Sequence, residues 1–256
     1  MEENRFDVSN RVVIITGAGQ GLGREYALAF AREGATPVLA EINGDNLKSV
    51  AAEIEALGGR SLAVETDVGD PDSVNAMVDA AVTAYGRIDV LINNAAIFAA
   101  LPQRPFFEIP FEEWNRVIHV NITGSYLCAS AVTHPMKAAG QGRIINISSG
   151  TVPQGVPGFM HYVTSKSAII GMTRVMAREL SDDNINVNTV MPGYTTTEVK
   201  HASMNDNLHD FIQNKRLVKR AGTPDDLIGM AIFLASPAIS FISGQTLAVC
   251  GGEVMI

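Results

Sequence analysis

The sequence predicts an α/β fold: one doubly wound sheet of about seven parallel strands with helices on both faces. The first observation behind this prediction is that short, nearly continuous apolar runs alternate with longer segments of helical periodicity. Such apolar strands are typical of a parallel sheet, because helices cover both of its faces. The second observation is that glycine follows most of the helical segments, where a left-handed residue commonly ends a helix. Regular alternation of strand and helix indicates crossover connections and a parallel strand order.

The N-terminal part of the chain alternates four strands with three helices. The strand-like runs are rich in Val, Ile, Leu and Ala, and the helical segments end at Gly34, Gly58 and Gly86. The predicted strands span residues 12–16, 37–41, 61–66 and 88–92, and the predicted helices span residues 22–33, 45–57 and 72–85.

The C-terminal part continues the alternation with longer helices. The predicted helices span residues 111–139, 160–180 and 224–234, and the predicted strands span residues 143–147, 185–190 and 246–249. Residues 194–222 interrupt this pattern, because they are polar and lack a strand signal. A long excursion at the carboxyl edge of such a sheet predicts a substrate lid. We find no linker or internal repeat, so residues 1–256 are predicted to form a single domain.

Composition excludes several classes of function. The 256 residues carry a net charge of −8, which disfavours binding to nucleic acid or to anionic membranes. No apolar run reaches the roughly 18 residues of a membrane span, and the N-terminus lacks a signal-peptide pattern. The cysteines, Cys128 and Cys250, lie far apart, which predicts no disulfide and a cytoplasmic protein. The His and Cys residues show no metal-ligand spacing, so we expect no metal.

A glycine-rich turn joins the first strand to the first helix. Gly17 permits a tight turn, Gly21 lets the backbone approach a pyrophosphate, and Gly23 allows the helix to pack closely on the strand. The positive end of the helix dipole favours the phosphates. This pattern predicts a Rossmann-type dinucleotide site, to which Gln20 and Leu22 also contribute.

Glu41 ends the second strand, 18 residues after Gly23. A carboxylate there accepts hydrogen bonds from the ribose hydroxyls of the adenosine half and repels a 2′-phosphate. It therefore predicts NAD rather than NADP, although Arg24 lies near in the sequence. Further cofactor contacts are predicted after the third and fourth strands, at Asp67, Val68, Asn94 and Ala95.

Tyr162 and Lys166 form the most informative pair in the chain. Their four-residue spacing places them on the same face of a helix. A fixed ammonium favours the phenolate and so lowers the pKa of a tyrosine, which is about 10 when unperturbed. A decrease of about 3 units requires about 4 kcal/mol, which the lysine and a positively charged cofactor ring could supply together.

These motifs, in this order, resemble the short-chain dehydrogenase/reductase family, in its branch of roughly 250-residue single-domain enzymes. Ser149 stands 13 residues before Tyr162, which is the family's spacing. The resemblance covers nearly the whole chain, and Ala96 and Cys250 depart from the usual pattern. It rests on the turn at 16–23, Asn93 to Ala95, Asn121, Ser149, Tyr162, Lys166, Pro192, Gly193 and residues 244–247.

The resemblance implies a catalytic role for each of four residues. Tyr162 would be the general acid/base, and Ser149 would orient the substrate oxygen. Lys166 would bind the nicotinamide ribose and lower the pKa of Tyr162, while Asn121 would position a water molecule. The resemblance also implies cofactor contacts from Pro192, Gly193, Thr195 and Thr197.

The expected substrate pocket is mainly apolar, which favours a hydrophobic secondary alcohol or its ketone. Lys200 and His201 leave open an anionic substrate, should the 194–222 segment turn them inward. The resemblance further implies a homotetramer. The expected pocket residues are Phe98, Thr151, Phe159, Met160, Tyr194 and Met204.

Three functions compete on this sequence. The first is hydride transfer between NAD(H) and a hydrophobic secondary alcohol or ketone, with Tyr162 as acid/base. The second is an NADPH-dependent 3-oxoacyl-(acyl carrier protein) reductase, which would require a cation near positions 20 or 42 and a basic docking patch. The third is a non-enzymatic dinucleotide sensor, whose binding function would not require the combination of Asn121, Ser149, Tyr162 and Lys166.

Overall fold

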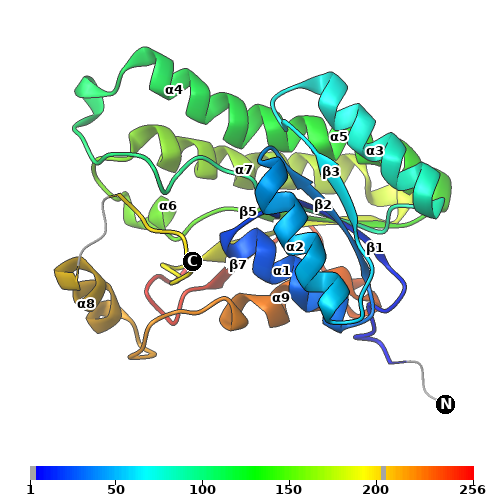
Figure 1. Cartoon of the computed structure of the whole chain (residues 1–256). Helices are drawn as coiled ribbons and strands as arrows, with labels where there is room; N and C mark the ends of the chain where they lie inside the picture. Colours follow the sequence, from blue (N-terminus) through cyan, green and yellow to red (C-terminus); the bar gives the residue numbers. More distant parts are fainter. Residues whose placement is uncertain (1–3, 203–205) are drawn as a thin grey trace.

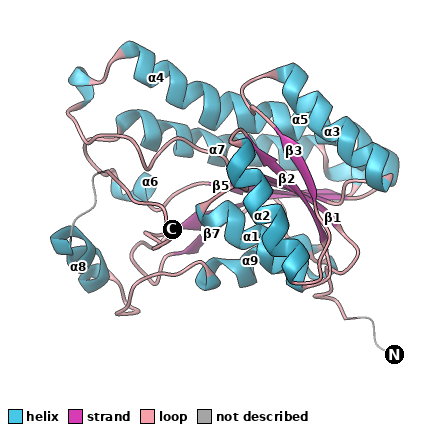
Figure 2. Ribbon diagram, in the orientation of Figure 1, coloured by secondary structure: helices cyan, strands magenta, loops and turns pink. Residues whose placement is uncertain are grey.

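The computed structural model describes residues 4–202 and 206–256. Its seven strands form one sheet in the order β3-β2-β1-β4-β5-β6-β7, and every neighbouring pair is parallel. Figure 2 shows the sheet between layers of helices. The predicted fold class is therefore confirmed. The strands are β1 (Val12–Thr16), β2 (Thr36–Glu41), β3 (Leu62–Glu65), β4 (Val90–Asn93), β5 (Gly142–Ile147), β6 (Ile185–Pro192) and β7 (Thr246–Val249).

Alternate residues of the central strands enter two separate cores. Val13 and Ile15 of β1 pack in the core that includes Phe30. Val12 and Ile14 point to the opposite face, where the core includes Met77. Burial of each large apolar side chain of this kind contributes about 1.5–3 kcal/mol. Both faces are therefore apolar, which explains the continuous hydrophobic runs in the sequence.

The helices divide between these two faces. Helices α1, α2 and α9 cover one face, and α3, α5 and α7 cover the other, as Figure 1 shows. The helices are α1 (Gly21–Arg32), α2 (Gly44–Ala56), α3 (Pro71–Tyr85), α4 (Phe111–Ile118), α5 (Gly124–Ala139), α6 (Thr151–Gln154), α7 (Met160–Glu179), α8 (Asp206–Lys215) and α9 (Asp225–Ala235).

Residues 111–139 are helical throughout, as predicted, but they do not form one regular α-helix. A π-helical turn at His119–Thr123 separates α4 from α5. An inserted turn of this kind adds one residue per hydrogen-bonded ring, and such turns often occur at functional sites. The apolar periodicity is helical on both sides of the turn, so the sequence pattern does not reveal it.

The 194–222 segment contains α8, which the sequence analysis did not predict. Figure 1 shows α8 at the periphery, apart from the helices that cover the sheet. The two ends of the segment are joined, because Thr195 bridges Gly222 and the N–H of Thr196 donates to the Gly222 carbonyl at 2.9 Å. The segment is therefore an excursion with a closed base.

The strand order places a topological switch point between β1 and β4. The chain winds outward from β1 through β2 and β3, and outward from β4 through β5, β6 and β7. Ligands of doubly wound sheets bind at the carboxyl ends of the strands beside such a point. Among the residues that the structure describes, no helix combines the length and apolarity needed to cross a membrane.

Candidate active site

The glycine turn between β1 and α1 has the geometry of a dinucleotide cradle. Gly17 has φ +65°, and a Cβ atom there would lie 2.9 Å from the Cα of Ala95. A Cβ on Gly23 would lie 2.0 Å from the Gly17 carbonyl oxygen. The Asn94 amide donates to the Thr16 carbonyl at 2.9 Å and so fixes the turn to the end of β4. Side chains are thus sterically excluded from the turn, which fits a bound pyrophosphate.

Glu41 lies beside this turn at the end of β2. Its Oε2 accepts a hydrogen bond from the Gly19 N–H at 3.1 Å, and its Oε1 accepts one from the Asn43 N–H at 3.0 Å. These bonds fix the carboxylate where the adenosine ribose is expected. Arg24 pairs with Glu25 and Glu53. The cation that the sequence left as a candidate for a 2′-phosphate is therefore held by two carboxylates.

The remaining predicted cofactor residues lie at the ends of neighbouring strands and in the 194–222 segment. Asp67 is exposed and accepts from the Gly69 N–H at 2.8 Å, whereas Val68 is buried. Pro192 accepts from the Gly150 N–H at 2.8 Å, and Thr195 donates to the Gly193 carbonyl at 3.1 Å. Near the glycine turn, Thr197 Oγ1 lies 3.8 Å from the position of a Cβ built on Gly21.

Tyr162, Lys166 and Ser149 converge at the carboxyl end of β5. Helix α7 carries Tyr162 and Lys166, and Ser149 hydrogen-bonds the Tyr162 phenol. The Lys166 Nζ donates to the Ile147 carbonyl at 2.8 Å and lies 5.8 Å from the centroid of the Tyr162 ring. All three side chains are buried. The structure therefore brings the Tyr162 phenol, the Ser149 hydroxyl and the Lys166 ammonium together, and the roles expected of them stay predictions.

Burial dominates the ionisation of this pair. It raises the pKa of Tyr162 to about 12, although the hydrogen bond from Ser149 acts in the opposite direction. Burial also lowers the pKa of Lys166 to about 8. In the protein alone, desolvation of the phenolate outweighs the hydrogen bond from Ser149. The decrease expected from Lys166 and the cofactor ring together stays a prediction.

Asn121 is completely buried in the π-helical turn. Its Oδ1 accepts from the Ile97 N–H at 2.8 Å, and its amide donates to Ser165 Oγ at 3.0 Å. Asn121 thus ties the loop after β4 to α7, one residue before Lys166. The predicted role in positioning a water molecule stays a prediction, and the structure adds this tie between two parts of the site.

Aromatic rings enclose the Tyr162 phenol. The Phe98 ring stacks on the Tyr162 ring with a centroid distance of 4.0 Å, and Phe159 meets Phe98 edge-on at 5.5 Å. His201 packs against Phe98 at 5.3 Å and against Tyr194 at 5.9 Å. The structure therefore brings together three of the predicted pocket residues, Phe98, Phe159 and Tyr194.

The other predicted pocket residues are Thr151, Met160 and Met204. Thr151 donates through its hydroxyl to Ser149 Oγ at 3.0 Å, which places it beside the predicted catalytic serine. Met160 is 47% exposed at the start of α7. Met204 lies outside the described residues. His201 was predicted only as a possible ligand for an anion, and no local sequence pattern indicates its contact with these aromatic rings.

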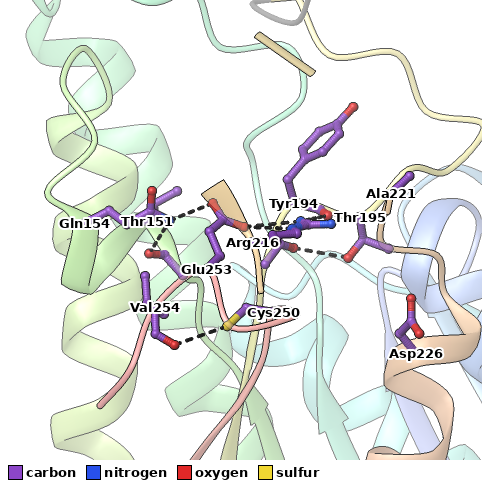
Figure 3. Close-up of polar contacts among 12 residues, drawn as sticks. Thr151, Gln154, Tyr194, Thr195, Arg216, Ala221, Asp226, Cys250, Glu253 and Val254 are labelled. Atoms are coloured by element: carbon purple, nitrogen blue, oxygen red, sulfur yellow. Dashed lines mark hydrogen bonds and ion pairs between the residues drawn. The ribbon is translucent and has the colours of Figure 1, made fainter. Parts of the chain in front are cut away.

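A second polar network supports the base of the 194–222 segment (Figure 3). Arg216 donates to Glu253 and to the backbone carbonyl of Tyr194. Glu253 also accepts from the Gln154 amide at 3.0 Å, and that amide donates to the Gly150 carbonyl at 3.0 Å. The C-terminal residues thereby connect the 194–222 segment with the loop that carries Ser149.

The family model described as enoyl-(acyl carrier protein) reductase matches residues 17–253. The (2S)-[(R)-hydroxy(phenyl)methyl]succinyl-CoA dehydrogenase subunit BbsD of Thauera aromatica is 36% identical over 250 residues, which cover 96% of this chain and 97% of that protein. The chain belongs to the short-chain dehydrogenase/reductase family. It is an oxidoreductase of this family, whose members bind nicotinamide dinucleotides.

Other members of the short-chain dehydrogenase/reductase family are similarly related. The 3-oxoacyl-[acyl-carrier-protein] reductase of Thermotoga maritima is 36% identical, with 97% of this chain and 99% of that protein covered. A 7α-hydroxysteroid dehydrogenase complexed with NADH and 7-oxoglycochenodeoxycholic acid superposes with a TM-score of 0.93 at 32% identity, covering 100% of this chain and 99% of that one. A Burkholderia cenocepacia gluconate 5-dehydrogenase with NADP and tartrate gives 0.91 at 32% identity, covering 98% and 97%.

The described residues of this family member contain no group of three or more His, Cys, Asp or Glu side chains that could hold a metal ion. The residues expected to carry the chemistry are Tyr162, Ser149 and Lys166. Together with the glycine turn and Glu41, they form one continuous site along the carboxyl edge of β1, β2, β4 and β5.

Proposed function

We propose that this protein interconverts a hydrophobic secondary alcohol and its ketone with NAD(H). The observation that carries this proposal is the Tyr162 phenol, which is hydrogen-bonded to Ser149 and stacked against Phe98. The proposed acid/base group thus lies in a cluster of apolar and aromatic side chains, at the same sheet edge as the glycine turn. The bound nicotinamide would supply the hydride acceptor or donor.

The protein side chains transfer the proton and orient the substrate oxygen. In alcohol oxidation, Tyr162 accepts the hydroxyl proton, and in ketone reduction it returns a proton to the carbonyl oxygen. Ser149 hydrogen-bonds the same oxygen and holds it near the phenol. Lys166, fixed by the Ile147 carbonyl, presents its ammonium beside the tyrosine and favours the phenolate. The enclosing aromatic rings exclude water from the reacting oxygen.

The preference for NAD is supported by the charges around the adenosine end of the site. The Glu41 carboxylate is fixed by two backbone N–H groups and would repel a 2′-phosphate. Arg24 is paired with Glu53 and Glu25. Neutralisation of a 2′-phosphate by Arg24 would require breaking these pairs, which adds to the cost of binding NADP.

The substrate proposal is supported by the rings of Phe98, Phe159 and Tyr194. Two relatives support a secondary alcohol or ketone as the reacting group. The name of the Thauera aromatica protein describes a phenyl-bearing carbinol within a succinyl-CoA, and the hydroxysteroid dehydrogenase was solved with 7-oxoglycochenodeoxycholic acid. Residues 194–222 are proposed as the lid of the pocket, since His201 packs on Phe98.

We also propose a cytoplasmic homotetramer. Large apolar side chains are exposed on helices α5 and α7 and at the C-terminus, where subunit contacts would cover them. They include Tyr126 at 57% exposure, Val175 at 54%, Met255 at 79% and Ile256 at 66%. Light scattering coupled to size-exclusion chromatography should give about four times the chain mass.

The alternative function is reduction of a 3-oxoacyl group on an acyl carrier protein, which the Thermotoga maritima relative favours. The two functions differ in cofactor and in substrate size. An NADPH-dependent reductase would need to overcome the fixed Glu41 carboxylate, and an acidic carrier protein would approach a chain whose net charge is −8.

A substrate screen tests the proposal directly. Aryl alkyl, cyclic and steroid ketones, gluconate-type polyols and 3-oxoacyl thioesters are each supplied with NADH or NADPH, and nicotinamide absorbance is followed. We expect the highest kcat/KM for an apolar ketone with NADH, and loss of turnover in Tyr162→Phe with NADH binding retained. Turnover of 3-oxoacyl thioesters with NADPH alone would establish the alternative. NADH binding without turnover of any substrate would favour a sensor.

A further inference from the structure

Residues 197–199 lie across the glycine turn. The Gly21 N–H donates to Glu198 Oε1 at 2.8 Å. A Cβ built on Gly21 would lie 3.3 Å from Val199 Cγ2 and 3.8 Å from Thr197 Oγ1. A segment 177 residues further along the chain therefore contacts the first residue of α1.

The Gly21 amide is one of the groups expected to receive the diphosphate of a dinucleotide. It is the first N–H of α1, where backbone donors lack partners within the helix and where the helix dipole is positive. Helix α1 has no acidic residue in its first turn, and its N-cap residue makes no side-chain hydrogen bond. Glu198 supplies the negative charge that the sequence of α1 itself does not provide.

The same segment continues to the aromatic pocket. The Ala202 N–H donates to the Ala99 carbonyl at 2.8 Å, and the preceding His201 packs on Phe98. Residues 197–202 therefore span the distance from the dinucleotide cradle to the rings above Tyr162. Only two residues separate Glu198 from His201, so the two contacts are made by one short span.

We propose that Glu198 competes with the cofactor diphosphate for the N-terminus of α1, so that cofactor binding displaces residues 197–199 and opens the aromatic pocket. One N–H cannot serve the carboxylate and the phosphate at once, and the two anions repel each other. Glu198 is exposed, so water solvates its carboxylate after displacement. The proposal depends on dinucleotide binding but not on the identity of the substrate.

The Glu198→Gln variant tests the competition, because it preserves shape and removes charge. We expect NADH and ADP to bind about two- to fivefold more tightly, which corresponds to one charge at a helix N-terminus. Adenosine, which lacks phosphates, should bind equally to both proteins. Isothermal titration calorimetry with ADP and adenosine, and NADH fluorescence, measure the three affinities. The gain should shrink at high ionic strength, since salt screens exposed charges.

Asp210→Asn provides the matched control, because Asp210 is 76% exposed on α8 and its loss changes the net charge equally. An equal gain in that control, or unchanged or weaker diphosphate binding in Glu198→Gln, overturns the competition. If no variant binds NADH or ADP, the cofactor assignment itself fails, which separates that failure from failure of the Glu198 role.

Hydrogen exchange at the Ala202 amide tests the coupling to the pocket. In the unmodified protein, ADP should accelerate exchange of this amide, because displacement of Glu198 should weaken the hydrogen bond from the Ala202 N–H to the Ala99 carbonyl. In Glu198→Ala, exchange should already be fast and should change little with ADP. Unchanged Ala202 exchange on addition of saturating ADP to the unmodified protein would overturn the coupling.

Discussion

Arg216 and Glu253 form a buried ion pair, with Nη2 and Oε2 3.2 Å apart and side-chain exposures of 3% and 5%. Arg216 also donates to the Tyr194 and Arg220 carbonyls, which lie near the two ends of the 194–222 segment. The pair therefore fastens both ends of this segment to the C-terminal residues. Removing one partner would leave the other charge buried without compensation.

Arg216→Ala should destabilise the protein by about 3–5 kcal/mol, the usual result of breaking a buried ion pair. Urea denaturation monitored by circular dichroism measures the change. Arg220→Ala is the matched control, because its pair with Asp226 is more exposed and such pairs contribute under about 1 kcal/mol. Limited trypsin digestion should cut the 194–222 segment faster in the Arg216 variant only. Equal stability losses in the two variants would contradict the proposed fastening.

Lys166→Met should raise the free energy of unfolding at pH 7 by about 1–2 kcal/mol, although it removes a catalytic group. Burial lowers the pKa of Lys166 from 10.5 to about 8, so the charged form destabilises the folded state. Loss of the hydrogen bond to Ile147 reduces the gain.

The pH dependence of this gain follows from the direction of the pKa shift. Between pH 8 and 10.5 the unfolded chain binds more protons at Lys166 than the folded chain, so the unmodified protein gains stability as pH rises. The advantage of Lys166→Met should therefore be full below pH 8 and smaller at pH 9.5. Urea titrations at pH 7 and 9.5 measure it, with Lys48→Met, at a largely exposed lysine, as the control. A destabilised Lys166→Met protein at pH 7 would contradict the expectation.

Alcohol oxidation should accelerate with rising pH, because Tyr162 accepts a proton as the phenolate. Burial raises the pKa of Tyr162 to about 12 in the protein alone. Lys166 and the positive nicotinamide ring are the charges that favour the phenolate during turnover. In Lys166→Met the rising limb of kcat/KM should shift to higher pH. An unshifted limb with a lowered plateau would mean that Lys166 acts only in binding.

Glu41→Ala should narrow the preference for NAD over NADP. The change removes the ribose acceptor and the charge that repels a 2′-phosphate, so NAD binding should weaken about tenfold while NADP binding improves. Affinities for both reduced cofactors come from fluorescence titration. Glu65→Ala, at the end of the neighbouring strand β3, controls for loss of one negative charge. Equal affinities for NAD and NADP in the unmodified protein would refute the assignment.

Phe98→Ala should change which ketones are reduced. The Phe98 ring occupies space directly against Tyr162, at a centroid distance of 4.0 Å. Its removal should lower kcat/KM for small apolar ketones, because contact area is lost, and raise it for bulkier ones. Phe107→Ala, at a ring that is 73% exposed, should leave the order of substrates unchanged. A uniform loss across the ketone series in Phe98→Ala would indicate a structural role instead.

Local patterns predicted the strands, the helices other than α6 and α8, and the spacing of the candidate catalytic residues. Apolar runs between helical segments predicted all seven strands, since burial on both faces leaves a continuous hydrophobic signal. Tyr162 and Lys166 were predictable as neighbours because one helix fixes their spacing. Gly17 and Gly23 were predictable because only glycine fits a turn where a Cβ would meet backbone atoms.

The sequence by itself therefore determined the α/β fold, the dinucleotide turn and the residue types of the acid/base site, because each depends on the conformation of one short stretch. Only the tertiary structure decided which distant residues meet. Glu198 accepts a hydrogen bond from Gly21. His201 packs against both Phe98 and Tyr194. Arg216 pairs with Glu253, and each of these contacts depends on the packing of separate elements. The tertiary structure also decided the direction in which the pKa of Tyr162 shifts, because that direction depends on how completely the packed elements exclude water from the phenol.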